Sequence, residues 1–165
     1  MGALIIEDGT IVAGANSFVT DAEYVDYAAD RGLEIGAYDG ARKLELIKAM
    51  DYILSLEARL KGARVNSTQL LPFPRLDVYV NGFYIESDTI PLNAKTGQME
   101  AAAASFAQNL LTNATQNDVK REKLGPMESE LFEGGSWTIE RTERVDAALA
   151  PLMNSKGFGS TARVL

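Results

Sequence analysis

The sequence of 165 residues contains no cysteine and no histidine. These absences exclude thiolate and imidazole zinc sites, cysteine nucleophiles and Ser-His-Asp triads. They also exclude disulfides and the side chain that normally titrates near neutral pH. The chemistry that remains is that of carboxylate, Lys, Tyr or Ser groups, or of magnesium held by acids.

Long hydrophobic runs are absent too. No apolar run approaches the ~20 residues of a membrane span, and the N-terminus lacks the basic and apolar segments of a secretory signal. We therefore expect a soluble intracellular protein without a membrane partner.

Basic residues are fewer than acidic ones: 16 Lys and Arg stand against 23 Asp and Glu, which gives a net charge of −7. Residues 1–41 hold eight acids and one base, whereas residues 42–165 hold fifteen of each. The net charge therefore belongs to the first quarter of the chain. Such a balance disfavours a general electrostatic grip on nucleic acid.

Apolar periodicity and caps predict the first two helices. Thr20 and Glu23 form a capping box for a helix over about 21–30, with Tyr24 and Tyr27 on its apolar face. The strongest pattern predicts a helix over about 40–60 with Asp39 as its N-cap. The residues expected on its apolar stripe are Leu44, Leu46, Ile47, Met50, Ile53, Leu54 and Leu60. Those expected on its outward, charged face are Glu45, Lys48, Asp51, Ser55 and Arg59.

Two more helices are predicted further along the chain. Pro91 opens a helix to about residue 112, and the run 101–104 of alanines leaves room for another backbone. A last helix covers about 143–153, where Pro151 disturbs the final turn. The residues expected on the buried sides are Leu92, Met99, Ala102, Ala103, Phe106, Leu110, Leu111, Val145, Leu149 and Leu152.

Turn signals predict short hairpins between and beside the helices. Asp8-Gly9 indicates a hairpin or extended arm over residues 1–14, and Asn81-Gly82 a hairpin of 78–80 with 83–85. Residues 118–132 suit two short strands, and residues 154–165 a flexible arm. The expected fold is mainly α: a small bundle of three to four helices with short β-hairpins and extended terminal arms, in one domain over residues 1–153.

Motifs for ligand binding are weak. Residues 62–69 have a phosphate-loop interpretation with Arg64 and Ser67 as ligands, but an ordinary connecting loop is favoured. The acid pairs of the sequence lack a third acid at a defensible spacing for magnesium, and solvated loop charges are favoured. Four tyrosines have two interpretations: Tyr24, Tyr27, Tyr38 and Tyr52. They could form a stacking platform for single-stranded nucleic acid, but half-buried packing is favoured.

The segment 69–75 combines two prolines with apolar side chains and a fixed charge. The prolines favour an extended path, Phe73 favours burial, and Arg75 needs a partner or water. Two interpretations stay open. Either the segment is a wedge across the helices in which Arg75 holds the loop or a neighbouring subunit, or it packs only against its own core.

The order of these motifs resembles the head-tail connector or adaptor proteins of tailed bacteriophages. It runs from GANSFVTDAEYVDYAADRG (14–32) through LIKAMDYI (46–53) and GARVNSTQLLPFPR (62–75) to IP (90–91) before an Ala-rich helix. Relatives often have Trp-Pro-Arg where this chain has Phe73-Pro74-Arg75. Many relatives are labelled DnaT-like single-stranded DNA-binding proteins.

This resemblance implies a structural virion protein without enzymatic activity, catalytic residues, cofactor or metal. It implies a homo-oligomeric ring of about twelve copies in the neck, below the portal. Its partners would be its own copies, the portal protein, tail or neck proteins, and genomic DNA that passes without specific binding. We expect assembly in the host cytoplasm, with the acidic ring repelling DNA phosphates.

Contacts to neighbouring subunits or the portal are expected at Phe73, Pro74, Arg75, Lys156, Phe158, Arg163, Val164 and Leu165. The N-terminal segment is expected to order in the same assembly. The first alternative is a single-stranded DNA-binding module, which would bind tightly and salt-sensitively. The second, a hydrolase using carboxylates and magnesium, needs three acids that converge in one cleft.

Overall fold

The computed structural model describes residues 3–107, 110 and 143–154. Contacts divide the chain into two units, Met1–Leu110 with Thr142–Leu165, and Leu111–Arg141. Every helix and strand given below belongs to the first unit. The strands expected within 118–132 and the arm expected after Asn154 lie outside the described residues, and the single domain over 1–153 stays a prediction.

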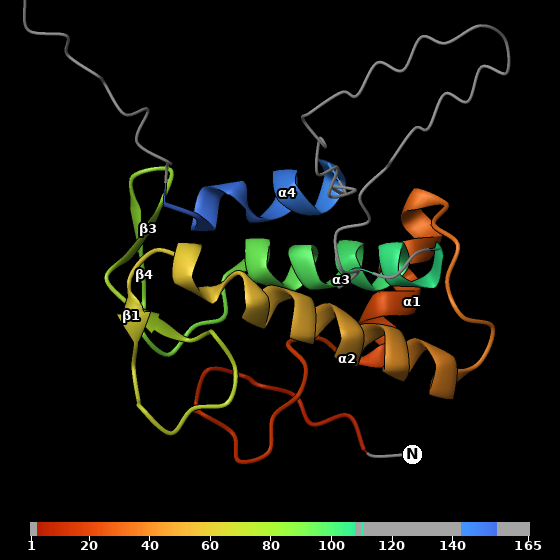
Figure 1. Cartoon of the computed structure of the whole chain (residues 1–165), viewed down its shortest axis with the longest axis horizontal. Helices are drawn as coiled ribbons and strands as arrows, with labels where there is room; N and C mark the ends of the chain where they lie inside the picture. The colour runs from red at the N-terminus through yellow and green to blue at the C-terminus, as the bar shows by residue number, and fades with distance from the viewer. Residues whose placement is uncertain (1–2, 108–109, 111–142, 155–165) are drawn as a thin grey trace, which may run out of the picture. The chain divides into compact units, whose positions relative to one another are not determined.

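Helix α3 (Leu92–Ala107) is the centre of the first unit. It packs against α2 (Asp39–Ser55) on one side and α4 (Glu143–Leu149) on the other, and it also contacts α1 (Asp21–Arg31) (Figure 1). The expected mainly helical fold with short hairpins is confirmed. No helix in the described ranges is long and apolar enough to cross a membrane.

Small residues allow the close approach of helices to α3. Ala101 and Ala102 are fully buried, as the alanine run predicts. A Cβ atom built on Gly97 would lie 2.3 Å from Cδ2 of Leu149, so α4 packs directly on the backbone of α3 at this glycine. Glycine and alanine here set the distance between two helices.

The helix ends test the capping predictions. The Thr20–Glu23 capping box is present, and α1 ends at Arg31 with Gly32 as its C-cap. The N-cap of α2 is Tyr38 and not Asp39; Asp39 is already helical and accepts a hydrogen bond from Lys43 Nζ at 2.7 Å. The helix also ends at Ser55, earlier than predicted, and a 3-10 turn η1 (Glu57–Arg59) follows. At the other end of the chain, η2 (Ala150–Leu152) contains Pro151 and replaces the last helical turn as predicted.

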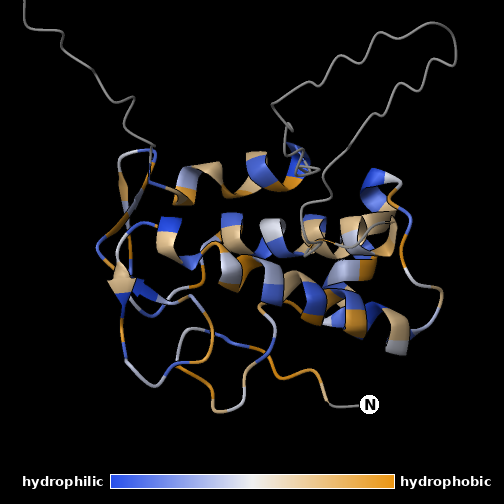
Figure 2. Ribbon diagram, in the orientation of Figure 1, coloured by the Kyte–Doolittle hydropathy of each residue, from blue (hydrophilic) through white to orange (hydrophobic). Residues whose placement is uncertain are grey.

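The core is formed by apolar side chains from all of these helices and the loops between them. In Figure 2 apolar and polar residues alternate in bands along the helices. Leu46, Met50 and Ile53 are buried as predicted, but Leu44, Leu92 and Phe106 are exposed. Leu92 and Phe106 were expected inside because they continue the apolar pattern of α3, but they stand at its two ends, beyond the stretch that the other helices cover.

Four short strands form two separate antiparallel pairs. Strand β1 (Ala63–Arg64) pairs with β2 (Arg75–Leu76), and thereby closes the loop between them. Strand β3 (Val78–Val80) pairs with β4 (Phe83–Ile85) across Asn81-Gly82. This second hairpin is the one that the sequence predicts, and both turn residues have positive φ, 52° and 85°.

Of the hairpin or extended arm expected for residues 1–14, the hairpin does not form in the described part of the segment. Its backbone instead turns around the buried carboxylate of Glu7, which accepts hydrogen bonds from the amides of Gly9, Ile11 and Val12, each at 2.9 Å. Ile6 forms an isolated parallel bridge with Ser17. The side chain of Glu7 satisfies the amides that a second strand would have bound.

Candidate functional site

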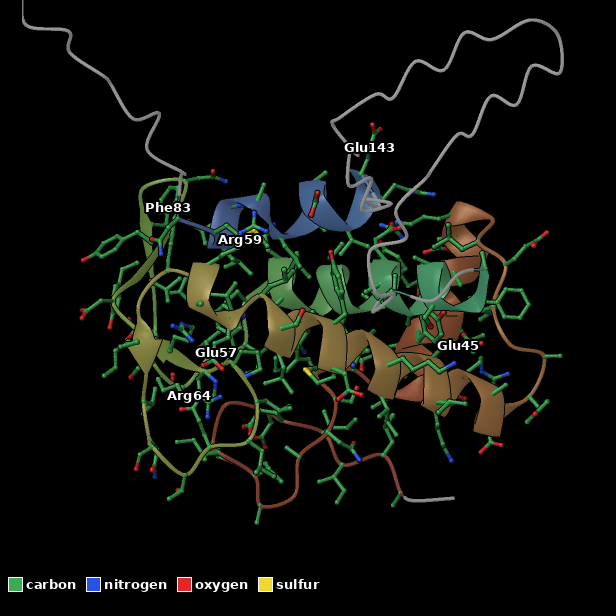
Figure 3. The ribbon with its side chains drawn as sticks, in the orientation of Figure 1. Glu45, Glu57, Arg59, Arg64, Phe83 and Glu143 are labelled. Atoms are coloured by element: carbon green, nitrogen blue, oxygen red, sulfur yellow. The ribbon has the colours of Figure 1, made fainter. Side chains whose placement is uncertain are left out.

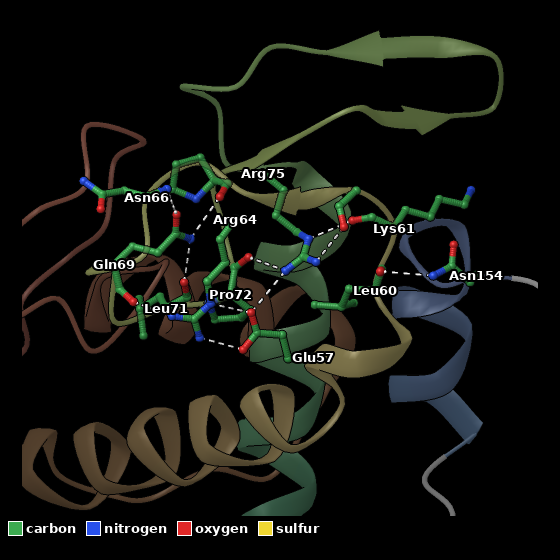
Figure 4. Close-up of polar contacts among 12 residues, drawn as sticks. Glu57, Leu60, Lys61, Arg64, Asn66, Gln69, Leu71, Pro72, Arg75 and Asn154 are labelled. Carbon is green, nitrogen blue, oxygen red and sulfur yellow. Dashed lines mark hydrogen bonds and ion pairs between the residues drawn. The ribbon is translucent and has the colours of Figure 1, made fainter.

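The segment singled out by the sequence is fixed inside the fold by Arg75. Its guanidinium donates from Nε to the carbonyl of Lys61 at 2.7 Å and from Nη2 to the carbonyl of Gly62 at 2.8 Å. Nη1 donates to the carbonyl of Pro72 and to Glu57, both at 3.2 Å (Figure 4). Arg75 is 6% exposed, and burial lowers its pKa. One side chain thus ties both ends of the loop to η1.

Glu57 is the carboxylate that two arginines share. Arg64 donates to both of its oxygens at 2.6 Å, and Arg75 adds the contact already described. These contacts hold the pKa of the Glu57 carboxyl below its ordinary value, and the hydrogen bond from Arg64 has the largest effect. Arg64 also donates to the carbonyl of Gln69 at 2.6 Å. Its guanidinium is therefore engaged within the loop, as in the favoured interpretation of residues 62–69, and not presented to a phosphate.

Other polar groups and the aromatic ring of the loop also have their partners within the chain. The side-chain amide of Gln69 donates from Nε2 to the carbonyls of Leu71 and Pro74, at 2.9 and 3.0 Å. Phe73 is 1% exposed and its ring meets that of Phe18 edge to face, with centroids 6.3 Å apart. Pro74 is buried as well.

This geometry favours one of the two interpretations of segment 69–75. Phe73, Pro74 and Arg75 contact their own core and leave little surface for a second subunit. The other expected contact residues lie outside the part of the chain that the structure describes, and they stay predictions: Lys156, Phe158, Arg163, Val164 and Leu165.

Two tyrosines of α1 bind buried acids. Tyr24 donates to Glu45 at 3.0 Å, and Glu45 also accepts from the amide of Gly36 at 2.9 Å. Glu45 was expected on the outward face of α2, which is wrong: it lies buried between α2 and α1 (Figure 3), where burial raises the pKa of its carboxyl. The charge pattern misplaced it because a carboxylate with two donors is accommodated inside.

Tyr27 makes the second of these contacts, donating to Glu100 at 2.7 Å. Burial, and then this bond, raise the pKa of Tyr27 to about 12. Arg31 stacks on the Tyr27 ring at 3.7 Å from its centroid. Tyr24 is fully buried, whereas Tyr38 is exposed. Tyr24 and Tyr27 therefore serve packing, and together with the exposed Tyr38 they do not form a common stacking surface.

Metal-binding acids do not gather in the described residues. No group of three or more Asp or Glu side chains there is placed to hold an ion. Of the acid pairs in the sequence, Glu7 is used by the N-terminal amides, and Asp8 binds Thr10. Glu128 and Glu130 lie beyond the described ranges.

The sequence analysis missed the exposed aromatic residues of the β3–β4 hairpin. Phe83 is 75% exposed, Tyr79 54% and Tyr84 44%, and Figure 3 shows Phe83 at the end of the molecule away from α1. The rings of Tyr79 and Tyr84 form a cross-strand pair with centroids 5.4 Å apart. The alternation Val78-Tyr79-Val80 carried the signal, because neighbouring strand residues face opposite sides and the two valines are buried.

The described residues carry the acidity of the protein. They contain ten Lys and Arg and seventeen Asp and Glu, a difference of −7, and the remaining residues balance at six of each. Five of the ten cations are held in ion pairs with carboxylates: Arg42, Lys43, Arg64, Arg75 and Arg144. The surface of this unit therefore has an excess of negative charge.

Comparison with known proteins gives one match. A family model described as "Putative DnaT-like ssDNA binding protein" matches residues 2–165. No curated protein and no solved structure matches the chain.

Proposed function

Since the chain belongs to the family described as "Putative DnaT-like ssDNA binding protein", and its motif order resembles phage head-tail adaptors, we propose that it is an adaptor subunit. In this proposal, copies form a ring below the portal in the neck of the virion. The ring joins the head to the tail and continues the channel through which the genome passes. The subunit has no catalytic role and needs no cofactor.

The charge of the described unit is the observation that carries this proposal. A protein that grips single-stranded DNA needs a basic groove along the phosphates. Here the acids exceed the bases by seven, and half of the bases are already neutralised by carboxylates. Repeated around a ring, such a surface repels the phosphates of passing DNA and keeps the genome from sticking.

The use of the polar side chains supports the same proposal. No buried side-chain nitrogen or oxygen in the described residues lacks a hydrogen-bond partner. The reactive types that composition allows, such as Glu45, Tyr24 and Arg75, are engaged in contacts that hold loops and helices together. They act as a scaffold for a fixed shape, which is what a ring subunit requires.

The experiment that tests this proposal has two arms. In the first, native mass spectrometry and electron microscopy follow the full chain mixed with purified portal rings, and we expect rings that add to the portal. In the second, fluorescence anisotropy follows labelled single-stranded DNA at low salt, and we expect no saturation below about 100 μM protein. A protein that stays monomeric with the portal, yet binds DNA tightly and in a salt-dependent manner, would refute the proposal.

The alternative is the single-stranded DNA-binding module that the family description names. The exposed pair of Tyr79 and Tyr84 favours it, because bases stack on such rings. The charge of the hairpin opposes it, since residues 77–88 include Asp77, Glu86 and Asp88 and no base, and these acids outnumber Lys61, whose Nζ donates to the carbonyl of Tyr79 at 3.2 Å. Replacing both tyrosines with serine should abolish DNA binding if this alternative holds.

A further inference from the structure

The aromatic hairpin, residues 77–88, exposes side chains for which the fold has no use. Val78 and Val80 point inward and are buried, so the hairpin is held to the core by its valines. Tyr79 and Tyr84 pair on the opposite face, whereas Phe83, the cross-strand partner of Val80, lies at the turn on the valine side and is exposed there. Exposed large aromatics that cluster on one element mark an interaction surface.

The hairpin also has a backbone edge at β4 that no described strand pairs with. The edge of β3 is partly occupied, because Lys61 Nζ donates to the carbonyl of Tyr79 at 3.2 Å and η2 packs against this strand. An extended peptide that lies along the β4 edge gains main-chain hydrogen bonds and places alternate side chains on the two faces. The aromatic face and the edge together suit an extended apolar peptide.

The charge of the hairpin indicates which kind of peptide would fit. Asp77, Glu86 and Asp88 are all exposed, and no base occurs between residues 77 and 88. Lys61 Nζ donates to the carbonyl of Tyr79 at 3.2 Å, and the three acids still outnumber this base. The partner should therefore be basic as well as apolar.

One segment of this chain has that composition. Residues 155–165, SKGFGSTARVL, contain two bases, no acid, and the apolar Phe158, Val164 and Leu165. The segment follows Asn154, whose amide donates to the carbonyl of Arg59 at 2.8 Å, and Met153 bridges to Leu60. It thus starts from a fixed point in the fold, and fully extended it reaches roughly 35 Å.

We propose that residues 155–165 of one copy bind the aromatic hairpin of a second copy. Val164 and Leu165 would cover the rings of Tyr79 and Tyr84, and Phe158 would reach Phe83 around the turn, while Lys156 and Arg163 face the hairpin's acids. The inference rests on the proposed function, because it names the contact that links adaptor subunits. Such a head-to-tail contact uses two different surfaces of each copy and closes into a ring when the rotation per subunit permits.

A second copy is a better occupant than the same chain. The turn η2, which leads to residue 155, packs against β3, and its Leu152 joins Val78 and Val80 in the core. The segment therefore starts on the inner side of the hairpin, whereas the tyrosine pair lies on the outer side. To cover its own tyrosines, the segment must turn around a strand edge; to reach those of a neighbour, it only needs to continue outward.

A mixing experiment with full-length variants tests the proposal. The hairpin variant carries Tyr79→Ser, Phe83→Ser and Tyr84→Ser, and the tail variant carries Phe158→Ser, Val164→Ser and Leu165→Ser. Native mass spectrometry should show wild-type rings, but each variant alone as a monomer. Mixed, the two should give a 1:1 dimer, since one intact tail meets one intact hairpin. The matched control is Tyr38→Ser, an exposed tyrosine away from the hairpin, which should assemble as wild type does.

Charge reversal supplies a second test in case the triple hairpin variant does not fold. Lys156→Glu with Arg163→Glu should weaken assembly at least tenfold, and adding Glu86→Lys with Asp88→Lys should restore it. Wild-type assembly should also weaken as salt rises.

Each other outcome is decisive. Rings from both triple variants refute the proposed contact and leave the adaptor function intact. Two monomeric variants that stay monomeric when mixed place the tail on its own hairpin and overturn the proposal. A wild-type chain that forms no ring, alone or with the portal, refutes both the contact and the adaptor function. If the hairpin variant loses DNA binding while its assembly is unchanged, the aromatic side chains are a stacking surface for bases, and the proposed contact is refuted.

Discussion

Two neighbouring segments of this protein use similar residues in opposite ways. The loop 61–76 and the hairpin 77–88 both combine aromatic side chains, turn residues and short paired strands. In the loop, Phe73 is buried and every arginine binds within the chain. In the hairpin, Phe83 and both tyrosines are exposed. Composition alone does not separate a segment with buried side chains from one with exposed side chains; the supply of internal partners does.

The prolines of the loop explain why it needs such partners. Proline has no amide to donate, so Pro72 and Pro74 cannot extend a ladder of backbone hydrogen bonds. Their carbonyls still require donors once buried. Side chains supply them: Arg75 donates to Pro72, and Gln69 to Pro74. The loop is therefore buried because long polar side chains reach back to it, whereas the hairpin satisfies the backbone groups between its two strands through strand pairing.

The largest expected effect comes from truncating one phenylalanine in each segment. Phe73→Ala should lower the free energy of unfolding by about 3–5 kcal/mol, because it leaves a cavity beside Phe18. Phe83→Ala removes an exposed ring and should cost under about 0.5 kcal/mol. Urea denaturation followed by circular dichroism measures both. Equal losses for the two variants would contradict the comparison, since they would mean that the hairpin ring is also part of the core.

Two glycines provide the next test. Both have positive φ, 72° at Gly62 and 85° at Gly82. At Gly62 an added Cβ would lie 2.0 Å from the carbonyl oxygen of Leu76, whereas at Gly82 nothing lies within 4 Å. Gly82→Ala should cost about 1 kcal/mol for backbone strain alone, and Gly62→Ala about 2–4 kcal/mol, because the paired strands must also separate.

Thermal and urea unfolding of the two alanine variants would measure this difference. Both substitutions add the same methyl group to a left-handed residue, so each serves as the control for the other. If Gly62→Ala were no worse than Gly82→Ala, the loop would have to be free to move away from Leu76, and the described loop geometry would be wrong.

The helices and the β3–β4 hairpin were predictable because their signals are local. A capping box, a proline near a helix end and an Asn-Gly turn act over a few residues. The N-terminal segment was not predictable in this way, because Glu7 satisfies three amides with one side chain and so removes the need for a second strand. A pattern of apolar residues contains no information on such a contact.

The candidate site was only partly predictable. The sequence showed that Arg75 needs a partner, but not that Glu57 and three carbonyls provide it, since these contacts join residues up to eighteen positions apart. Glu45 was misplaced for the same reason, as its donors come from Tyr24 and Gly36. The exposed face of the hairpin could have been found from the alternation of its residues, but the binding role that we propose for it also needs the face to be uncovered, and sequence alone does not show which described elements cover it.

The last expected effect concerns pH, and it again separates carboxylates by their partners. The pKa of Glu57 is lowered, so its ion pairs stabilise the fold above the ordinary glutamate pKa of about 4.3, and this stabilisation is lost as pH falls through the lowered value. Glu57→Gln should cost about 2 kcal/mol at pH 7, with the difference from wild type shrinking below about pH 4. The pKa of Glu45 is raised by burial, so its ionisation opposes folding as pH rises, and Glu45→Gln should gain on wild type in that direction. Urea denaturation from pH 2.5 to 8 measures both differences, and parallel curves for the two variants would show that the arginines do not determine the protonation of Glu57.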